Sequence, residues 1–183
     1  MKVKEIILMA AYELGLGAEM QEYYNSGTVG TTEQSELFLQ CFNLVENELA
    51  LDYLPLYAED ELETKTGVVN YALLQNSAVR ILRVENEAGE AVKFDLYAEY
   101  LKTEPGVVKV QYTYTPKKKK IADESDFTLQ ASERLLSYGV ASEYALATGR
   151  FEEAAVWEKK YKEAINAAYA LRPAKKLRSR RWC

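Results

Sequence analysis

Residues 127–171 constrain the fold more than any other part of the sequence. Alanine, leucine, glutamate and lysine dominate this stretch, which contains no proline, and these residues are strong helix formers. Gly149 interrupts the stretch, and a glycine just past a helix end is the usual left-handed cap. The pattern predicts two helices, 128–147 and 151–171, joined as an antiparallel hairpin. Both carry more apolar surface than one seam needs, so we expect them to pack on another part of the chain, on neighbouring copies, or on both.

Two further helices are predicted in the N-terminal part of the chain. Apolar residues recur at helical spacing over 3–14 and again over 32–54, where Pro55 ends the second helix. Residues 17–31 contain too few apolar side chains for a core element and are expected to form a loop. Five residues on the apolar faces of the predicted helices are expected to be largely buried: Phe38, Phe42, Leu135, Tyr161 and Ile165.

Between residues 62 and 115 the apolar pattern alternates instead of following a helical period. The alternation is clear over 92–96 and over 108–115, and it predicts half-buried antiparallel strands. A hairpin loop at 87–90 and a Pro-Gly turn at 105–106 separate the strands. The sequence therefore predicts an α+β fold that is mainly helical, with a helical bundle from the N- and C-terminal helices and an inserted antiparallel β meander.

The length of 183 residues allows one domain with a sizeable core, or one core with an inserted module. On this basis we divide the chain into four segments. These are residues 1–57 (N-terminal helices of the core bundle), 58–120 (β module and basic linker), 121–172 (C-terminal helical hairpin of the same bundle) and 173–183 (basic tail).

Charge is distributed unevenly, although the net charge is only −5. Residues 1–64 carry 13 acidic and two basic side chains, whereas residues 65–183 carry 15 acidic and 21 basic ones. An asymmetry of this kind often marks a charged tail that has a partner. Four lysines follow Pro116 in a predicted linker, where they either contact phosphates or a neighbouring copy, or only keep the linker solvated: Lys117, Lys118, Lys119 and Lys120.

The C-terminal tail mixes basic and apolar residues. Tryptophan and arginine are the residue types that most often anchor interfaces, and a purely solvating tail has little use for a penultimate tryptophan. A solvated, disordered terminus is the alternative interpretation. The candidate interface residues are Lys175, Lys176, Leu177, Arg178, Arg180, Arg181 and Trp182.

The sequence offers little for catalysis. It contains no histidine, which is the commonest general base and the commonest zinc ligand, and no glycine-rich phosphate loop. Glu59, Asp60, Glu61 and Glu63 could hold a divalent cation, but clusters of this kind are usually solvated surface. Cys41 lies on an apolar helical face without a histidine to deprotonate it, so we expect a small core residue.

Neither export nor membrane insertion is expected. No apolar run approaches the ~20 residues that a membrane span needs. Glu5, Tyr12 and Glu13 interrupt the apolar region that a signal peptide would require. Cys41 and Cys183 make no disulfide framework, which agrees with a reducing compartment.

The C-terminal hairpin resembles that of the head–tail connector proteins of tailed bacteriophages, also called adaptor or head-completion proteins. The similarity lies in a helix rich in small residues, a glycine-centred turn, and a Trp/Tyr-marked helix before a basic tail. These features stand in the sequence LLSYGVASEYALATGRFEEAAVWEKKYKEAI. The N-terminal helices are similar in layout, whereas strands 62–115 correspond only by position.

The resemblance implies a structural virion protein at the head–tail junction, assembled in the cytoplasm of a bacterial host, with no catalytic residue, metal or cofactor. It implies a homo-oligomeric ring, usually dodecameric, beneath the portal protein. The basic tail would dock on the portal, and other surfaces would meet downstream tail or nozzle proteins. DNA would pass through the lumen without sequence-specific binding, and no membrane would take part. The candidates for a tail- or neighbour-facing surface are the strands within 79–114 and three residues of the predicted N-terminal loop: Tyr23, Tyr24 and Asn25.

Two other classes of function compete with this one. A non-specific nucleic-acid-binding module would use the lysine run and the basic tail, but the acidic N-terminal half would crowd any bound DNA. A small enzyme built on the acidic cluster has no other support in the sequence. The salt dependence of binding to random duplex DNA would separate the nucleic-acid module from a connector.

Overall fold

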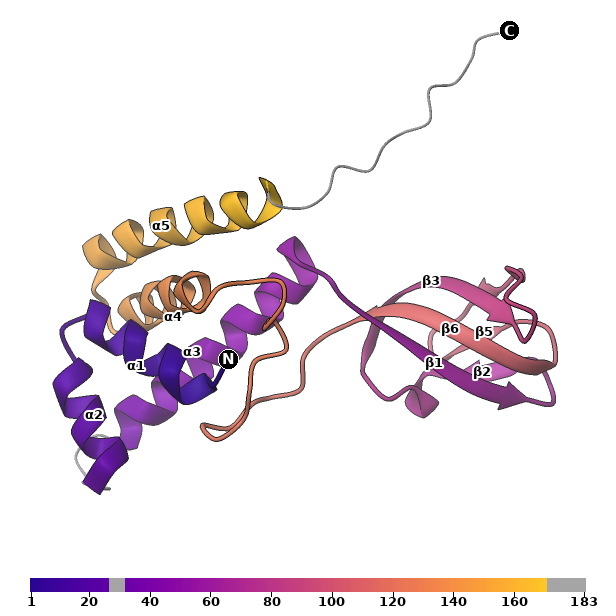
Figure 1. Cartoon of the computed structure of the whole chain (residues 1–183), viewed down its shortest axis with the longest axis horizontal. Coiled ribbons are helices and arrows are strands. Elements are labelled where there is room, and N and C mark those ends of the chain that lie inside the picture. Colours follow the sequence, from indigo (N-terminus) through magenta and orange to yellow (C-terminus); the bar gives the residue numbers. More distant parts are fainter. Residues whose placement is uncertain (27–31, 171–183) are drawn as a thin grey trace, which may run out of the picture.

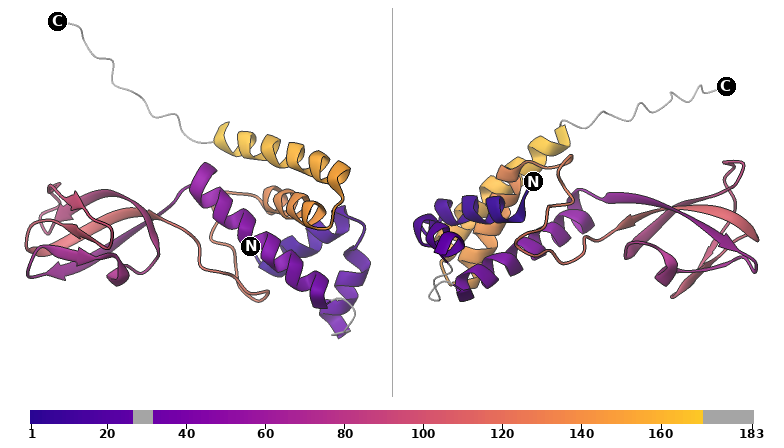
Figure 2. Two further views of the ribbon diagram at one scale, coloured as in Figure 1. Left: turned by 180° about the vertical axis from the view of Figure 1, so that it is seen from behind. Right: turned by 60° about the horizontal axis from the view of Figure 1, so that its bottom comes forward.

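The computed structural model describes residues 1–26 and 32–170, in which the chain forms five α-helices and two antiparallel sheets. The fold is therefore mixed α+β, as predicted. The helices gather at one end of the molecule and the strands form a module that projects from the other end (Figures 1 and 2). The helices are α1 (Val3–Glu13), α2 (Gly17–Ser26), α3 (Thr32–Glu48), α4 (Glu133–Ala147) and α5 (Phe151–Ala170), and a π-helical turn, η2 (Leu49–Tyr53), extends α3.

The larger sheet has the order β1-β6-β3 and the smaller one the order β2-β5-β4. Because β6 pairs with both β1 and β3, strands that are neighbours in the sheet are not neighbours in the chain. The larger sheet is thus not the simple meander that the alternating pattern predicted. The strands are β1 (Leu56–Thr64), β2 (Val68–Asn70), β3 (Ala78–Asn86), β4 (Asp95–Leu96), β5 (Tyr100–Lys102) and β6 (Gly106–Tyr114), and a 3₁₀ turn, η3 (Tyr71–Leu73), follows β2.

Helix α4 is the centre of the helical part and packs against α1, α3 and α5. The Tyr144 ring of α4 stacks on Phe38 of α3, with 3.8 Å between the ring centroids. At Gly139 an added Cβ would lie 2.7 Å from Val45 Cγ1 and 2.9 Å from Tyr161 Cε2. Helices α3 and α5 can therefore approach the α4 backbone this closely only because residue 139 has no side chain. All five predicted core residues are buried in this cluster: Phe38, Phe42, Leu135, Tyr161 and Ile165.

The hairpin turn matches the sequence prediction, but α4 begins later than expected. Gly149 adopts a left-handed backbone with φ of 77°, as its position after a helix predicted. Ser132 caps α4 because its hydroxyl accepts a hydrogen bond from the Leu135 N–H at 3.1 Å. The residues before this cap form a turn in which Phe127 is fully buried, so an apolar residue counted as helical belongs to a turn.

The predicted loop at 17–31 is wrong over most of its length, because residues Gly17–Ser26 form α2. Gly15, with φ of 76°, turns the chain between α1 and α2. Met20 is fully buried and both tyrosines of α2 are half-buried against the helical core. A short helix needs few apolar residues when one long side chain anchors it, which explains why the sparse pattern was misleading. The rest of the predicted loop lies outside the described residues.

The predicted strand at 92–96 is also largely wrong. The 87–90 turn forms as predicted, with Gly89 at φ of 78° and its N–H donating to the Asn86 carbonyl at 2.9 Å. After it, the Val92 N–H donates to the Val84 carbonyl at 3.0 Å, and the chain then leaves β3. Only β4 is paired in this region, and Val92 instead packs half-buried on the hydrophobic cluster of the β module. Alternation shows that a segment has two faces but does not name its partner strand.

The close approach at Gly139 generates the first prediction. Alanine favours a helix over glycine by about 1 kcal/mol. Gly139→Ala should nevertheless lower the free energy of unfolding by about 1–3 kcal/mol, because the methyl group overpacks the contact with Val45 and Tyr161. Chemical denaturation measures this difference. As a control, Val156→Ile adds a methyl group at an exposed position of α5 and should change stability by less than about 0.5 kcal/mol. A stabilised Gly139→Ala protein would contradict the packing described here.

Candidate interaction surfaces

The connecting segment 115–132, between β6 and α4, is attached to α3 by its backbone. The Asn43 side chain accepts a hydrogen bond from the Lys119 N–H at 2.6 Å and donates to the Lys119 carbonyl at 3.2 Å. Further along, the Val3 N–H donates to the Asp123 carbonyl at 3.1 Å. The connecting segment therefore ties α3 to the N-terminus of the chain.

Glu46 of α3 holds the same segment from inside the protein. It is 1% exposed, and its Oε1 accepts hydrogen bonds from the Ser125 hydroxyl at 2.5 Å and from the Asp126 N–H at 3.3 Å. Its Oε2 is buried and has no hydrogen-bond partner within the part of the chain that the structure describes. Burial raises the pKa of this carboxyl, while Ser125 and the Lys119 ammonium partly oppose the shift and Asp126 adds to it. The sequence contained a signal for this role, because residue 46 falls on the buried stripe of α3.

The lysine run does not form one free basic patch. Lys117, Lys118 and Lys120 are exposed. The Lys119 ammonium is 2.6 Å from the Asp126 carboxylate, and its side chain is only 12% exposed. Three of the four lysines thus remain available to a phosphate or to a neighbouring copy, and that contact stays a prediction.

A groove of about 500 Å³ lies between α3 and the connecting segment. Leu44 of α3 lines it and is 58% exposed, and Leu51 of η2 is also exposed. The remaining lining comes from the same helix and from the start of the connecting segment: Gln40, Asn43, Glu46, Asn47, Pro116, Lys117 and Lys118.

Helix α5 leaves most of its surface uncovered. It buries a narrow stripe formed by Ala154, Tyr161 and Ile165. Phe151 is 69% exposed and Val156 is 54% exposed. Large exposed apolar side chains therefore lie on α3 with its extension η2 and on α5, the helices that pack against α4.

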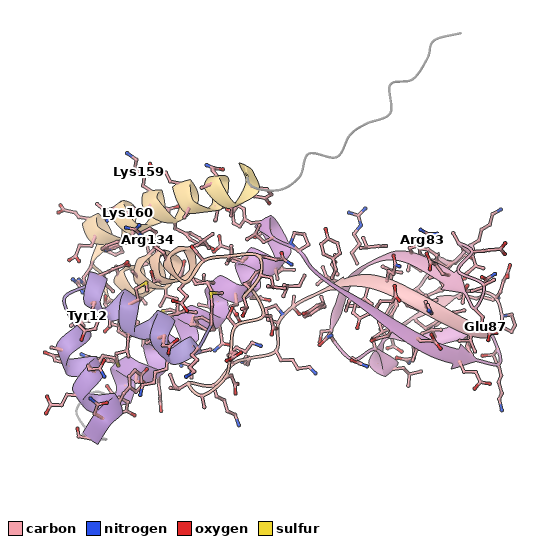
Figure 3. All side chains as sticks on the ribbon, viewed as in Figure 1. Tyr12, Arg83, Glu87, Arg134, Lys159 and Lys160 are labelled. Atoms are coloured by element: carbon pink, nitrogen blue, oxygen red, sulfur yellow. The ribbon has the colours of Figure 1, made fainter. Side chains whose placement is uncertain are left out.

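Aromatic and cationic side chains gather where α4 meets α5. The rings of Tyr138 and Trp157 are 5.6 Å apart, and the Lys160 ammonium lies 3.9 Å from the Trp157 ring centroid. The Arg134 Nε donates to the Tyr138 hydroxyl at 2.6 Å. Figure 3 labels Arg134 and Lys160 on this side of the helices. The sequence pass missed this cluster, although the i, i+4 spacing of residues 134 and 138 was a usable signal.

Glu13 of α1 lies close to the same cluster. Its Oε1 accepts a weak hydrogen bond from the Ser137 hydroxyl at 3.4 Å, and its Oε2 is buried without a partner among the described residues. Burial raises the pKa of Glu13, and Ser137, Lys160 and Arg134 oppose the shift. The carboxyl thus connects α1 electrostatically to the cations of α4 and α5.

The acidic cluster of β1 is divided between the two faces of the sheet. Asp60 is buried, and its Oδ2 accepts hydrogen bonds from the Tyr112 hydroxyl at 2.7 Å and from the Gln75 N–H at 2.8 Å. Glu59, Glu61 and Glu63 alternate with it and are exposed on the opposite face. Across the described residues, no three His, Cys, Asp or Glu side chains are arranged to hold a metal ion.

The tyrosines predicted to lie in an N-terminal loop belong to α2. Tyr24 lies under the Lys4 ammonium, 5.0 Å from the ring centroid, and its hydroxyl accepts a hydrogen bond from Ser35 at 3.2 Å. Tyr23 packs on the Tyr24 ring at 5.5 Å, and Asn25 is exposed. Their contact with a tail protein or a neighbour stays a prediction. The candidate residues of the basic tail, 175–182, lie outside the described residues.

Cys41 is a buried core residue, as predicted. Burial, with a smaller contribution from Glu143, raises the pKa of its thiol to about 12. The thiolate is the nucleophilic form of cysteine, so the neutral thiol behaves as a small apolar group at physiological pH.

Comparison with protein-family models and with curated proteins finds no match for this chain. Within residues 1–26 and 32–170, none of the helices combines the length and the apolar character that crossing a membrane requires. The surfaces described above are therefore the basis for a functional proposal.

Glu46 generates the second prediction. Its raised pKa means that the folded protein binds this proton more tightly than the unfolded chain, in which the value is near 4.5. The favourable contribution is complete below pH 4.5 and is lost as the pH rises through the folded pKa. Glu46→Gln should therefore gain stability relative to the wild type between pH 4.5 and pH 7. Thermal unfolding of both proteins across this range measures the difference, and a difference that does not change with pH would contradict an ionisable, buried Glu46.

Proposed function

We propose that the protein is a structural component of a tailed-bacteriophage virion that forms a ring beneath the portal and joins the capsid to the tail. The observation that carries this proposal is the exposed apolar surface on both sides of α4. Leu44 and Leu51 expose one part of it, and Phe151 and Val156 of α5 expose the other. Exposed apolar surface of this kind marks interaction sites more often than chance.

Two different apolar surfaces on one chain favour a closed ring. In a head-to-tail contact, each copy uses one surface toward the preceding copy and the other toward the following copy, and a rotation that closes produces a ring. Helices from both ends of the chain would form the ring-building bundle, with the β module as its insertion. The resemblance of the hairpin to connector proteins adds the expected dodecamer, the portal as partner, and the head–tail junction as location.

Charge supports a connector over a nucleic-acid-binding module. Residues 17–64, which include α2, α3 and β1, contain 11 acidic side chains and no basic one. Such a surface repels phosphate, so DNA would pass the ring without being held. The lysine run offers three exposed ammonium groups in place of the four that the alternative function assumed.

The apolar surfaces generate the third prediction. Leu44→Asp places a charge in the proposed contact, so we expect ring assembly to weaken at least about tenfold. Sedimentation velocity over a concentration series, alone and with purified portal protein, measures this change. Leu129→Asp is the matched control, because Leu129 is 98% exposed on the turn before α4 and belongs to neither surface. Equal assembly of the two variants would count against a contact through Leu44.

The basic tail generates the fourth prediction. Deleting residues 174–183 should leave thermal unfolding of the rest of the chain almost unchanged and should abolish docking on the portal. A buried tryptophan anchor typically contributes about 2 kcal/mol or more, and a closed ring multiplies the effect. Pull-down with portal and counting of tailed particles measure the loss. Infectious particles assembled with the truncated protein would show that the tail is only a solvated end.

A further inference from the structure

The order of the larger sheet places opposite charges at its two edges. Strand β1 is one edge and strand β3 is the other, with β6 between them. The exposed face of β1 carries Glu59, Glu61 and Glu63, and β1 contains no basic residue. Strand β3 carries Arg80 and Arg83, and both arginines are exposed. One edge of the module is therefore acidic and the opposite edge is largely basic.

Glutamates and arginines lie on the same face of the sheet. Gln111 of β6 is aligned with Glu59 on one side and with Arg83 on the other. The Gln111 Nε2 donates to Glu59 Oε2 at 2.8 Å, which places both side chains on one face. Arg80 is aligned with Thr113, two residues along β6 and thus on the same face again.

The spacing of the two charge pairs is matched by an irregularity in β3. Arg80 and Arg83 are three residues apart in sequence, but the register shift after Ile81 aligns them with Thr113 and Gln111, which are two residues apart. Glu59 and Glu61 are also two residues apart on a regular strand. Both pairs therefore repeat at about 6.8 Å along their edges.

We propose that β3 of one copy lies beside β1 of the next copy, so that Arg80 and Arg83 pair with the exposed glutamates of β1. This inference rests on the ring proposed above and adds a second contact between neighbours, made by the β module. Strands β1 and β3 both run antiparallel to β6, so they are parallel to each other. Parallel edges are what a head-to-tail contact between equally oriented copies requires.

The contact is made by side chains rather than by a continuous backbone ladder. Strand β3 has register shifts at Val79 and at Leu82, and such irregularities interrupt the row of free N–H and C=O groups on an edge strand. Val79 and Leu82 are themselves exposed, as is Tyr57 beside the glutamates. The two edges thus offer apolar contacts as well as opposite charges.

Existing ion pairs do not block this exchange. Arg83 is 2.8 Å from Glu85, and Glu61 is 3.6 Å from Lys109. Both pairs are at the surface, where an ion pair contributes about 0–1 kcal/mol, so either partner can rearrange. In Figure 3 Arg83 lies on the same long side of the molecule as Lys159 and Lys160 of α5, so a neighbour on that side would meet both modules.

Charge reversal of the full-length chain tests the proposal. One variant is Arg80→Glu with Arg83→Glu, another is Glu59→Arg with Glu61→Arg, and a third combines all four substitutions. Sedimentation velocity at low and physiological salt, with and without portal protein, gives the apparent dissociation constant of the ring. We expect each double variant to weaken assembly about tenfold and the fourfold variant to recover most of the loss, because its edges are complementary again.

Matched controls change the same charge away from both edges. Glu87→Arg with Glu104→Arg adds positive charge at exposed turns, and Lys65→Glu with Lys102→Glu adds negative charge at exposed positions outside the larger sheet. Both should assemble like the wild type, and thermal unfolding confirms that every variant is folded.

The outcomes separate this contact from the ring itself. A ring that forms equally well in every variant overturns the edge contact and leaves the ring in place. Double variants that weaken assembly without recovery in the fourfold variant also overturn it, because the two edges then do not meet each other. A wild-type chain that stays monomeric with and without portal overturns the proposed function together with the edge contact.

Discussion

The missing side chain at Gly139 is the constraint on which the helical part depends. Because no Cβ intervenes, Val45 of α3 and Tyr161 of α5 both reach the α4 backbone. The same seam is closed by the Ser142 hydroxyl, which donates to the Ala154 carbonyl at 3.2 Å. Helix α4 is buried as a result, and α5 needs only a narrow stripe to hold its place. The remaining surface of α5 is left for contacts outside the chain.

The β module is attached to this core by two chain crossings, and the second crossing is held firmly. Asn43 fixes the backbone at Lys119, and Glu46 fixes it again at Ser125 and Asp126. A buried carboxyl with a raised pKa is a costly anchor unless hydrogen bonds offset its desolvation. Here it joins α3, the connecting segment and the N-terminus in one polar network. The direction in which the β module leaves the helices follows from this attachment.

Much of the local structure was predictable from the sequence, whereas the partners of each element were not. Gly149, Cys41 and the buried faces of the long helices follow from helical period and glycine chemistry alone. Helix α2 was missed because Met20 anchors it through a contact with distant residues, which no local pattern records. The lysine run had the composition of a free basic patch. Asp126 removes Lys119 from it, and that pairing depends on how the connecting segment folds back.

The sequence by itself determined which segments are helical or extended, which faces are apolar, and how charge is divided between the halves of the chain. These properties depend on residues within a few positions of each other, so they can be read along the chain. Only the tertiary structure decided that β6 lies between β1 and β3. That order converts an acidic stretch and two separated arginines into opposite edges of one sheet. It depends on hydrogen bonds between strands some 20 to 50 residues apart, whose pairing is selected by packing of the whole module rather than by any local preference.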